Sequence, residues 1–127
     1  HNLENWKKLK VDAQEHVIGR TKLESIELDD DVKPDNAHIT RAVIEDDEGE
    51  ELEILRHSLP YGDGQGEQGL FFIAYTKDLT RIDKMLVRMF GTSGDGIHDR
   101  LLHFVTAVDG AYFFAPSEGV LGEVLEG

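Results

Sequence analysis

The sequence has no cysteine among its 127 residues, which excludes disulfides and metal sites built on thiolates. It also has no apolar run long enough to span a membrane and no signal-peptide pattern. From these features we expect a cytoplasmic protein that does not associate with membranes.

Basic residues are scarce as well. The sequence has 13 Lys and Arg against 26 Asp and Glu, which gives a formal net charge of −13 at pH 7. This charge argues against nucleic acid and anionic membrane surfaces as partners. The length is that of one domain, long enough to bury a core.

Hydrophobic periodicity predicts helices in five segments. They are residues 1–20 with a break before residue 11, 36–43, 78–90, 97–104 and 117–125. Asp12, the Asp35–Asn36 pair and Ser117 are candidate helix caps, and Gly19 is a candidate helix end. The acidic run at residues 45–51 predicts a turn around Gly49.

Runs of apolar, β-branched and aromatic residues predict strands in three segments. They are residues 52–59, 69–75 and 105–116. Pro60 is expected to end the first strand, a glycine-rich loop at residues 63–68 to follow it, and the second strand to be buried. The order strand, strand, helix, strand predicts an α+β domain whose antiparallel sheet carries helices on one face.

Two residues carry the strongest chemical signal. Arg56 lies within an apolar run, where a charged side chain is costly unless an anion meets it. His38 lies in a short helix whose Ile39 and Val43 are able to face a core. Together they are compatible with one buried anionic cofactor. The ordinary alternatives are a surface or core histidine and a salt bridge from Arg56 to the acidic turn.

Four stretches then match a known family in order and spacing. They are Ala37-His38-Ile39 with Arg41, Leu55-Arg56-His57-Ser58-Leu59-Pro60-Tyr61-Gly62, Gly69–Tyr75, and Asp99-Arg100-Leu101-Leu102-His103-Phe104. Together they resemble the C-terminal half of the dye-decolourising (Dyp-type) haem peroxidases. The resemblance implies a ferredoxin-like fold, heme b as cofactor, hydrogen peroxide as oxidant and a small-molecule reductant. Without cysteine, the haem would be held non-covalently.

The resemblance implies that His38 is the proximal ligand of the haem iron. Asp99 would then accept a hydrogen bond from the second imidazole nitrogen and lower the reduction potential of the iron. The alternative for Asp99 is a carboxylate placed at a helix N-terminus, where the helix dipole favours it. The sequence leaves both interpretations open.

On the distal side, the resemblance implies that Arg56 stabilises the negative charge that develops as peroxide is cleaved. Ser58 would line the same pocket, and Leu70 and Phe72 would pack against the porphyrin. Ordinary core packing explains the two apolar residues equally well.

The chain lacks the Gly-x-x-Asp-Gly motif that relatives carry in their N-terminal half. Gly94-Asp95-Gly96 follows the proximal residues and is not that motif. We therefore expect a helical segment or linker at residues 1–35, and a haem-binding domain at 36–127 that pairs with a separate N-terminal half or forms a homo-oligomer. A haem-binding or iron-handling module and a haem-free association domain remain alternatives.

His98 and His103 flank Asp99. Their five-residue spacing does not place them on one face of an α-helix, so no zinc site is predicted there.

Overall fold

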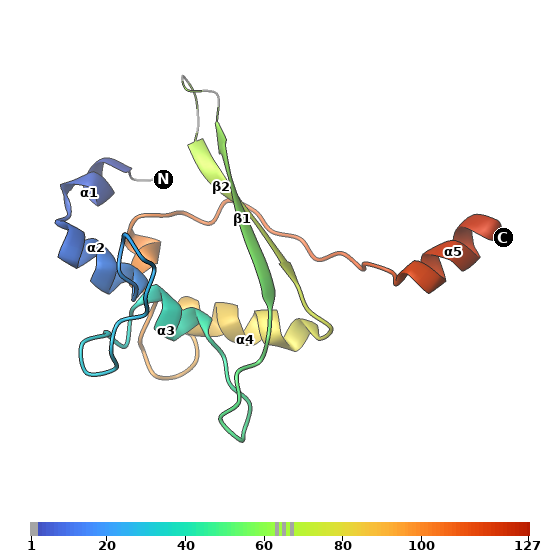
Figure 1. Ribbon diagram of the computed structural model, residues 1–127, viewed down its shortest axis with the longest axis horizontal. Coiled ribbons are helices and arrows are strands. Elements are labelled where there is room, and N and C mark those ends of the chain that lie inside the picture. The colour runs from blue at the N-terminus through green and yellow to red at the C-terminus, as the bar shows by residue number, and fades with distance from the viewer. Residues whose placement is uncertain (1–2, 63, 65, 67) are drawn as a thin grey trace.

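The computed structural model describes residues 3–62, 64, 66 and 68–127. Two consecutive strands stand between two groups of helices along the chain, in an α+β arrangement (Figure 1). In chain order they are α1 (Leu3–Lys8), α2 (Val11–Ile18), α3 (His38–Ala42), β1 (Leu55–Gly62), β2 (Gln68–Tyr75), α4 (Leu79–Met89), the 3₁₀ helix η1 (Arg100–His103) and α5 (Glu118–Glu126).

The sheet is an antiparallel hairpin of β1 and β2, paired from Leu55 opposite Tyr75 to Gly62 opposite Gln68. The first strand therefore begins three residues later than predicted and continues through Pro60, which was expected to end it. A two-stranded sheet leaves one edge of each strand open, and proline is tolerated at such an edge because it has no N–H to contribute to a ladder. The loop predicted at residues 63–68 includes positions 63, 65 and 67, which lie outside the described residues.

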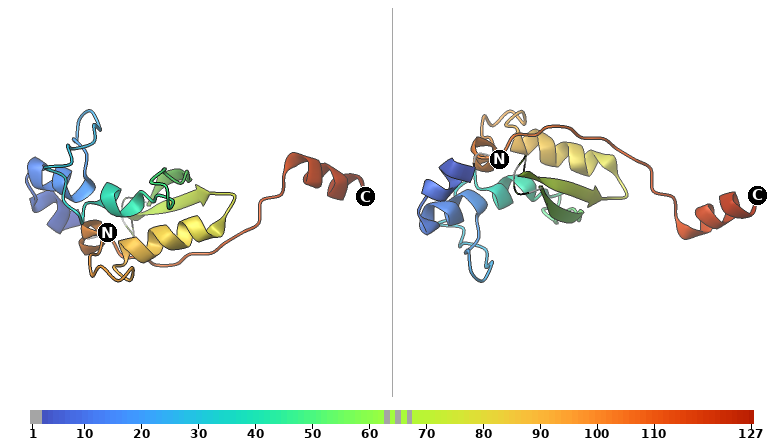
Figure 2. Two further views of the ribbon diagram at one scale, coloured as in Figure 1. Left: turned by 90° about the horizontal axis from the view of Figure 1, so that it is seen from below. Right: turned by 90° about the horizontal axis from the view of Figure 1, so that it is seen from above.

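Two further strand predictions are wrong. β2 was expected to be buried, but Leu70, Phe71 and Phe72 expose 53%, 59% and 49% of their surface. Within the described residues, 105–116 pair with no strand; they form an extended arm that leads to α5, away from the body of the molecule (Figures 1 and 2). These apolar segments need a second layer or a neighbouring strand, and the described residues supply neither.

The helix predictions fare better. α4 begins after Asp78, whose side chain accepts the Thr80 N–H at 2.9 Å, and it buries Ile82 and Met85. α2 ends as predicted at Gly19, which has the left-handed φ of +88°. Ser117 caps α5 as predicted. The 97–104 helix, by contrast, is a single 3₁₀ turn.

Two predicted caps are wrong. The residues that precede α2 and α3 are Lys10 and Ala37, and neither caps its helix with a side chain. Asp12 instead lies inside the first turn of α2, where its charge still suits the helix dipole. The Asp35–Asn36 pair precedes the cap position, and the Asn36 carbonyl accepts the Arg100 N–H.

The small core lies between α3 and α4. It consists of Ala42, Ile44, Ile82 and Met85. Leu52, Ile54, Ala74 and Met89 pack around it, so the hairpin meets the helices mainly through one residue just before β1 and one in β2.

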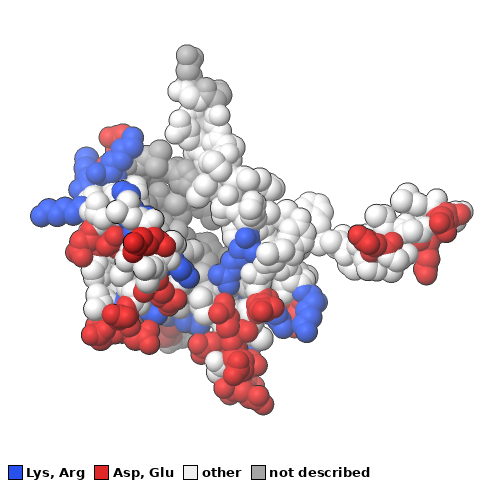
Figure 3. Space-filling model, in the orientation of Figure 1, with Lys and Arg blue, Asp and Glu red and all other residues white. Residues whose placement is uncertain are grey.

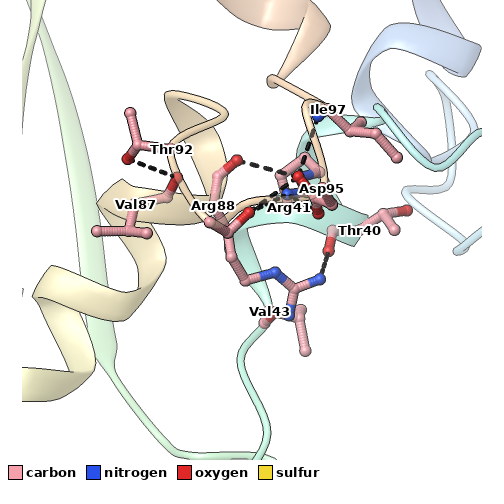
Figure 4. A network of polar contacts seen from close by, with 9 residues as sticks. Thr40, Arg41, Val43, Val87, Arg88, Thr92, Asp95 and Ile97 are labelled. Atoms are coloured by element: carbon pink, nitrogen blue, oxygen red, sulfur yellow. Dashed lines mark hydrogen bonds and ion pairs between the residues drawn. The ribbon is translucent and has the colours of Figure 1, made fainter.

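Two arginines clamp α3 to α4 (Figure 4). Arg41 is 4% exposed; its Nε donates to the Arg88 carbonyl at 3.1 Å, and one terminal nitrogen donates to Asp95 at 2.8 Å. Arg88 in turn donates to the carbonyls of Val43 at 2.9 Å and Thr40 at 2.7 Å. Burial of an arginine is costly unless its donors meet acceptors, so these hydrogen bonds favour the observed packing of α3 on α4.

Charged side chains gather over the helical body and the acidic turn at residues 45–51, whereas the hairpin carries few (Figure 3). None of the helices in the described residues is long and apolar enough to cross a membrane.

Gly19 packs against α3, and a Cβ at this position would overlap Cγ2 of Ile39. We expect Gly19→Ala to lower the free energy of unfolding by about 2–4 kcal/mol, because left-handed backbone costs about 1 and overpacking about 1–3. Gly49→Ala is the matched control, since Gly49 has a similar φ of +84° with no atom within 4 Å of the added Cβ. It should lose only about 1 kcal/mol in urea denaturation; equal losses would contradict tight packing at Gly19.

The ion pair of Arg41 and Asp95 predicts acid sensitivity. The Ile97 N–H, the Arg41 guanidinium and the Ser93 hydroxyl lower the pKa of Asp95 to about 2. Because this folded pKa lies below the unfolded value near 4, the stabilisation is complete above about pH 4 and is lost as the pH falls towards 2.

Asp95→Asn should therefore lower the urea midpoint at pH 7, with the difference from wild type shrinking towards pH 2. Asp47→Asn, in the exposed acidic turn, should show no such trend. A difference that stays constant from pH 7 to pH 2 would rule out the ionised carboxylate as its source.

Candidate functional site

His38 and Asp99, 61 residues apart in the chain, form one polar pair. His38 is the first residue of α3, and Asp99 immediately precedes η1. The Nδ1 atom of His38 lies 2.6 Å from Oδ2 of Asp99. Asp99 is fully buried, whereas the His38 side chain is 34% exposed. The imidazole is thus anchored on its buried side and open on the other.

The two oxygens of Asp99 make separate contacts in this geometry. Its Oδ1 accepts the Leu101 N–H at 2.8 Å and caps η1, while its Oδ2 meets His38. The backbone secures the carboxylate further, because the Asp99 N–H donates to the Met89 carbonyl at 2.8 Å. A buried carboxylate with several donors is a firm acceptor for the imidazole.

The carboxylate also decides which imidazole nitrogen is available. An ionised carboxylate only accepts hydrogen bonds, so Nδ1 of His38 is the donor of this pair. In the neutral ring Nε2 then carries the lone pair. Nε2 is thereby left able to accept a hydrogen bond or to bind a metal, while the carboxylate orients the ring through Nδ1.

His38 and Arg56 line one cavity of about 280 Å³. The Arg56 Nε is buried and has no hydrogen-bond partner among the described residues. No ion pair joins Arg56 to the acidic turn in this part of the chain, although Glu51 lines the same cavity. A cavity lined both by a buried arginine nitrogen that lacks a partner in the described part of the chain and by an open imidazole suits an anionic ligand.

Three charged residues of this cavity were not singled out from the sequence. They are Arg20, Glu27 and Glu51. Each belongs to an isolated antiparallel bridge, Arg20 with Glu27 and Glu45 with Glu51, outside any periodic element. Because their positions depend on loop conformation, hydrophobic periodicity carried no signal for them.

The hairpin register places the other predicted site residues on one face. Ser58 lies opposite Phe72, and Arg56 lies two residues before Ser58. Directly opposed residues, and residues two apart, share a face of an antiparallel pair. Leu70 joins them two residues before Phe72. The described chain leaves Leu70 and Phe72 half exposed, so they do not form a closed wall with His38.

Leu70 lines a second, larger cavity of about 640 Å³. Its other walls include Trp6, Tyr61, Leu101 and Phe104, and Ile18 lines both this cavity and the one between His38 and Arg56. The Trp6 and Phe104 rings meet edge to face at 5.2 Å. Ser58 and Phe72 line neither cavity. The cavity lined by His38 and Arg56 therefore lies next to the larger, apolar cavity lined by Leu70, with Ile18 in the wall of both.

Asp95 has a structural role here, as its pairing with Arg41 shows. In the described part of the chain, no group of three or more His, Asp or Glu is arranged to hold a metal ion. A metal at His38 would have to arrive with most of its ligands, as the iron of a porphyrin does.

Comparison with known proteins identifies the family of this chain. The family model "Dyp-type peroxidase, C-terminal" matches residues 1–120. Dye-decolorizing peroxidases of Mycolicibacterium paratuberculosis and Mycobacterium tuberculosis are each 48% identical to this chain, over 97% and 92% of its length. In both cases the chain covers only 35% of the relative. It thus spans about a third of the curated relatives it matches.

Solved structures agree with these relatives. DypB from Rhodococcus jostii RHA1 superposes with a TM-score of 0.89 at 48% identity, over 95% of this chain and 39% of DypB. A dye-decolorizing protein from V. cholerae gives 0.87 at 50% identity, over 97% and 40%. A DypB variant with a TM-score of 0.88 was solved in complex with heme. These neighbours confirm the predicted ferredoxin-like α+β fold.

The His38–Asp99 pair predicts a specific tautomer, which Asp99→Asn should reverse. The asparagine oxygen is still able to cap Leu101, which leaves the amide NH₂ to face Nδ1 of His38. That nitrogen must then accept, so the proton should move to Nε2. Long-range ¹H–¹⁵N NMR of the imidazole measures this directly, with Asp109→Asn in the exposed arm as the control. An unchanged tautomer in Asp99→Asn would show that the carboxylate does not select it.

Proposed function

Because this chain belongs to the Dyp-type peroxidase family, we propose that it is the C-terminal, haem-ligating part of a haem-dependent peroxidase. The enzyme would oxidise small-molecule reductants with hydrogen peroxide. The observation that carries this proposal is the pairing of His38 with Asp99 beside a cavity that His38 shares with Arg56, whose buried Nε has no partner among the described residues.

The residues fit a haem, which is a flat, largely apolar group with anionic propionates. His38 Nε2 offers a nitrogen ligand, and Arg56 and Arg20 offer cations within the same cavity. The neighbouring apolar cavity with Leu70 offers a surface for the macrocycle. With no cysteine in the chain, binding would be non-covalent.

Bound haem would supply the iron chemistry by which peroxide is reduced and a second substrate is oxidised. His38 would bind the haem iron through Nε2 and keep its proton on Nδ1. Asp99 accepts a hydrogen bond from that N–H, with its Oδ2 2.6 Å from Nδ1, which would increase the donor strength of the ligand and keep the ring from turning. Since Asp99 is itself fixed by Leu101 and Met89, the ligand is preorganised before the haem arrives.

Arg56 would stabilise negative charge on the peroxide oxygens. Its guanidinium stays protonated throughout, so it stabilises charge without moving a proton. Ser58, two residues along the same face of β1, would donate to or accept from a peroxide oxygen or water. Leu70 and Phe72 would exclude water from this side of the site.

A complete peroxidase also needs a group that moves the peroxide proton, and the described residues hold no family aspartate in that role. We propose that residues 36–127 form the haem-binding domain, with 1–35 as a preceding segment, and that a separate N-terminal half completes the pocket. The half-exposed apolar residues of β2 and the unpaired arm support this, because they need a covering layer. Homo-oligomerisation and a cytoplasmic location stay predictions.

The first test is a hemin titration of the purified chain followed by absorbance. We expect a one-to-one Soret shift, which His38→Ala should abolish because His38 is the one histidine among the described residues that line the cavity. His57→Ala is the matched control, since His57 is exposed on β1 next to Arg56, and it should behave as wild type. A shift that survives His38→Ala would contradict ligation by His38.

Turnover is measured next, as peroxide-dependent bleaching of an anthraquinone dye with the N-terminal half added. A Soret shift without bleaching would favour the alternative of a haem-binding module that lacks peroxidase activity.

A further inference from the structure

A pair of histidines, His98 and His103, lies at the η1 turn, apart from the cavity that His38 lines. The Nε2 atoms of His98 and His103 are 2.8 Å apart. The two ring planes differ by only 4°, and their centroids lie 5.1 Å apart. The nitrogens are therefore much closer than the ring centres, which means that the Nε2 edges face each other. Both residues are exposed.

The backbone holds the two residues in place. Gly91, with φ +72°, leaves room for His98, because a Cβ at Gly91 would lie 3.0 Å from the His98 Cβ. Between the two histidines, Asp99 is anchored to the Met89 carbonyl, and the Leu102 N–H donates to the Asp99 carbonyl at 3.1 Å. The pair is thus built on a fixed segment of backbone.

This placement corrects an expectation from the sequence. On an α-helix, side chains five residues apart lie on different faces. Here, however, only residues 100–103 are helical, in a 3₁₀ turn, and His98 lies in the irregular segment before it. The turn brings His103 back over His98, so the spacing that argued against a shared site does not apply.

We propose that His98 and His103 together chelate a divalent late transition-metal ion, Cu²⁺ in preference to Ni²⁺ or Zn²⁺. Imidazole suits these ions, and Cu²⁺ heads their affinity order. With metal–nitrogen bonds of about 2.0–2.1 Å, two nitrogens at a right angle on one ion lie about 2.9 Å apart. The observed 2.8 Å matches this separation, which is shorter than a tetrahedral ion would impose.

Charge and access favour the same ligand. The chain carries a formal charge of −13, which raises the local concentration of cations. Because both rings are exposed, each is able to turn its Nε2 lone pair from the facing nitrogen towards an ion, and water completes the coordination. The Asp99 carboxylate takes no part, since His38 and Leu101 occupy both its oxygens. The site is independent of the haem proposal.

The competing explanation is a plain N–H···N hydrogen bond between the two rings, which the same distance allows. The hydrogen bond and the metal site differ in the protonation of the two Nε2 atoms. A hydrogen bond needs a proton on one Nε2 atom, whereas a shared metal needs lone pairs on both. Copper titration therefore separates them.

The experiment is isothermal titration of the haem-free chain with CuCl₂ at pH 7.4. Wild type should bind one ion per chain at this site. Either His98→Ala or His103→Ala should weaken that binding by about 100-fold, because losing one of two linked ligands removes the chelate advantage. The control His57→Ala removes an exposed histidine elsewhere and should leave the affinity unchanged.

Electron paramagnetic resonance of the copper-loaded chain gives a second readout. Two equivalent nitrogens should couple to copper in wild type and in His57→Ala, and one in each single variant. The proposal is overturned if wild type takes up no copper, if either His98→Ala or His103→Ala binds as tightly as wild type, or if His57→Ala weakens binding as much as they do. Circular dichroism of the exposed-site variants checks that they fold.

Discussion

The hydrogen bond between His38 and Asp99 is the contact on which the rest of the site depends. It joins the start of α3 to the start of η1. The Asp99 carboxylate in this bond is fully buried, whereas the His38 ring is partly exposed. A buried carboxylate must have donors, and Asp99 has the Leu101 amide as well as the imidazole. The same bonds that satisfy this charge also orient the ring, so one carboxylate both joins two elements of the fold and fixes the imidazole.

The surrounding fold serves to keep that geometry constant. Arg41 and Arg88 tie α3 to α4 through backbone carbonyls and Asp95, and Gly19 allows α2 to approach the residues beside His38. Such a frame holds the His38–Asp99 pair in one arrangement. The hairpin is less restrained, because it reaches the core through few residues. Arg56 lies at its base, where the restrained and the open parts of the molecule meet.

Local sequence determined much of this. The apolar stripe and Asp78 specified α4, the glycine specified the end of α2, and the alternation of β1 placed Arg56 and Ser58 on one face. These features depend on neighbours within a few residues, and short-range preferences suffice for them. The motifs around His38, Arg56 and Asp99 also carried the family, which comparison then confirmed.

Tertiary structure alone decided the rest. It showed that Asp99 is both a cap and the partner of His38, that Arg41 pairs with Asp95, and that His98 meets His103. It also left β2 open and residues 105–116 without a ladder, against the expectation of a buried three-stranded sheet. Contacts between residues far apart in the chain depend on how elements pack, and a strand is buried only when another layer is present to cover it. Neither can be read from local pattern.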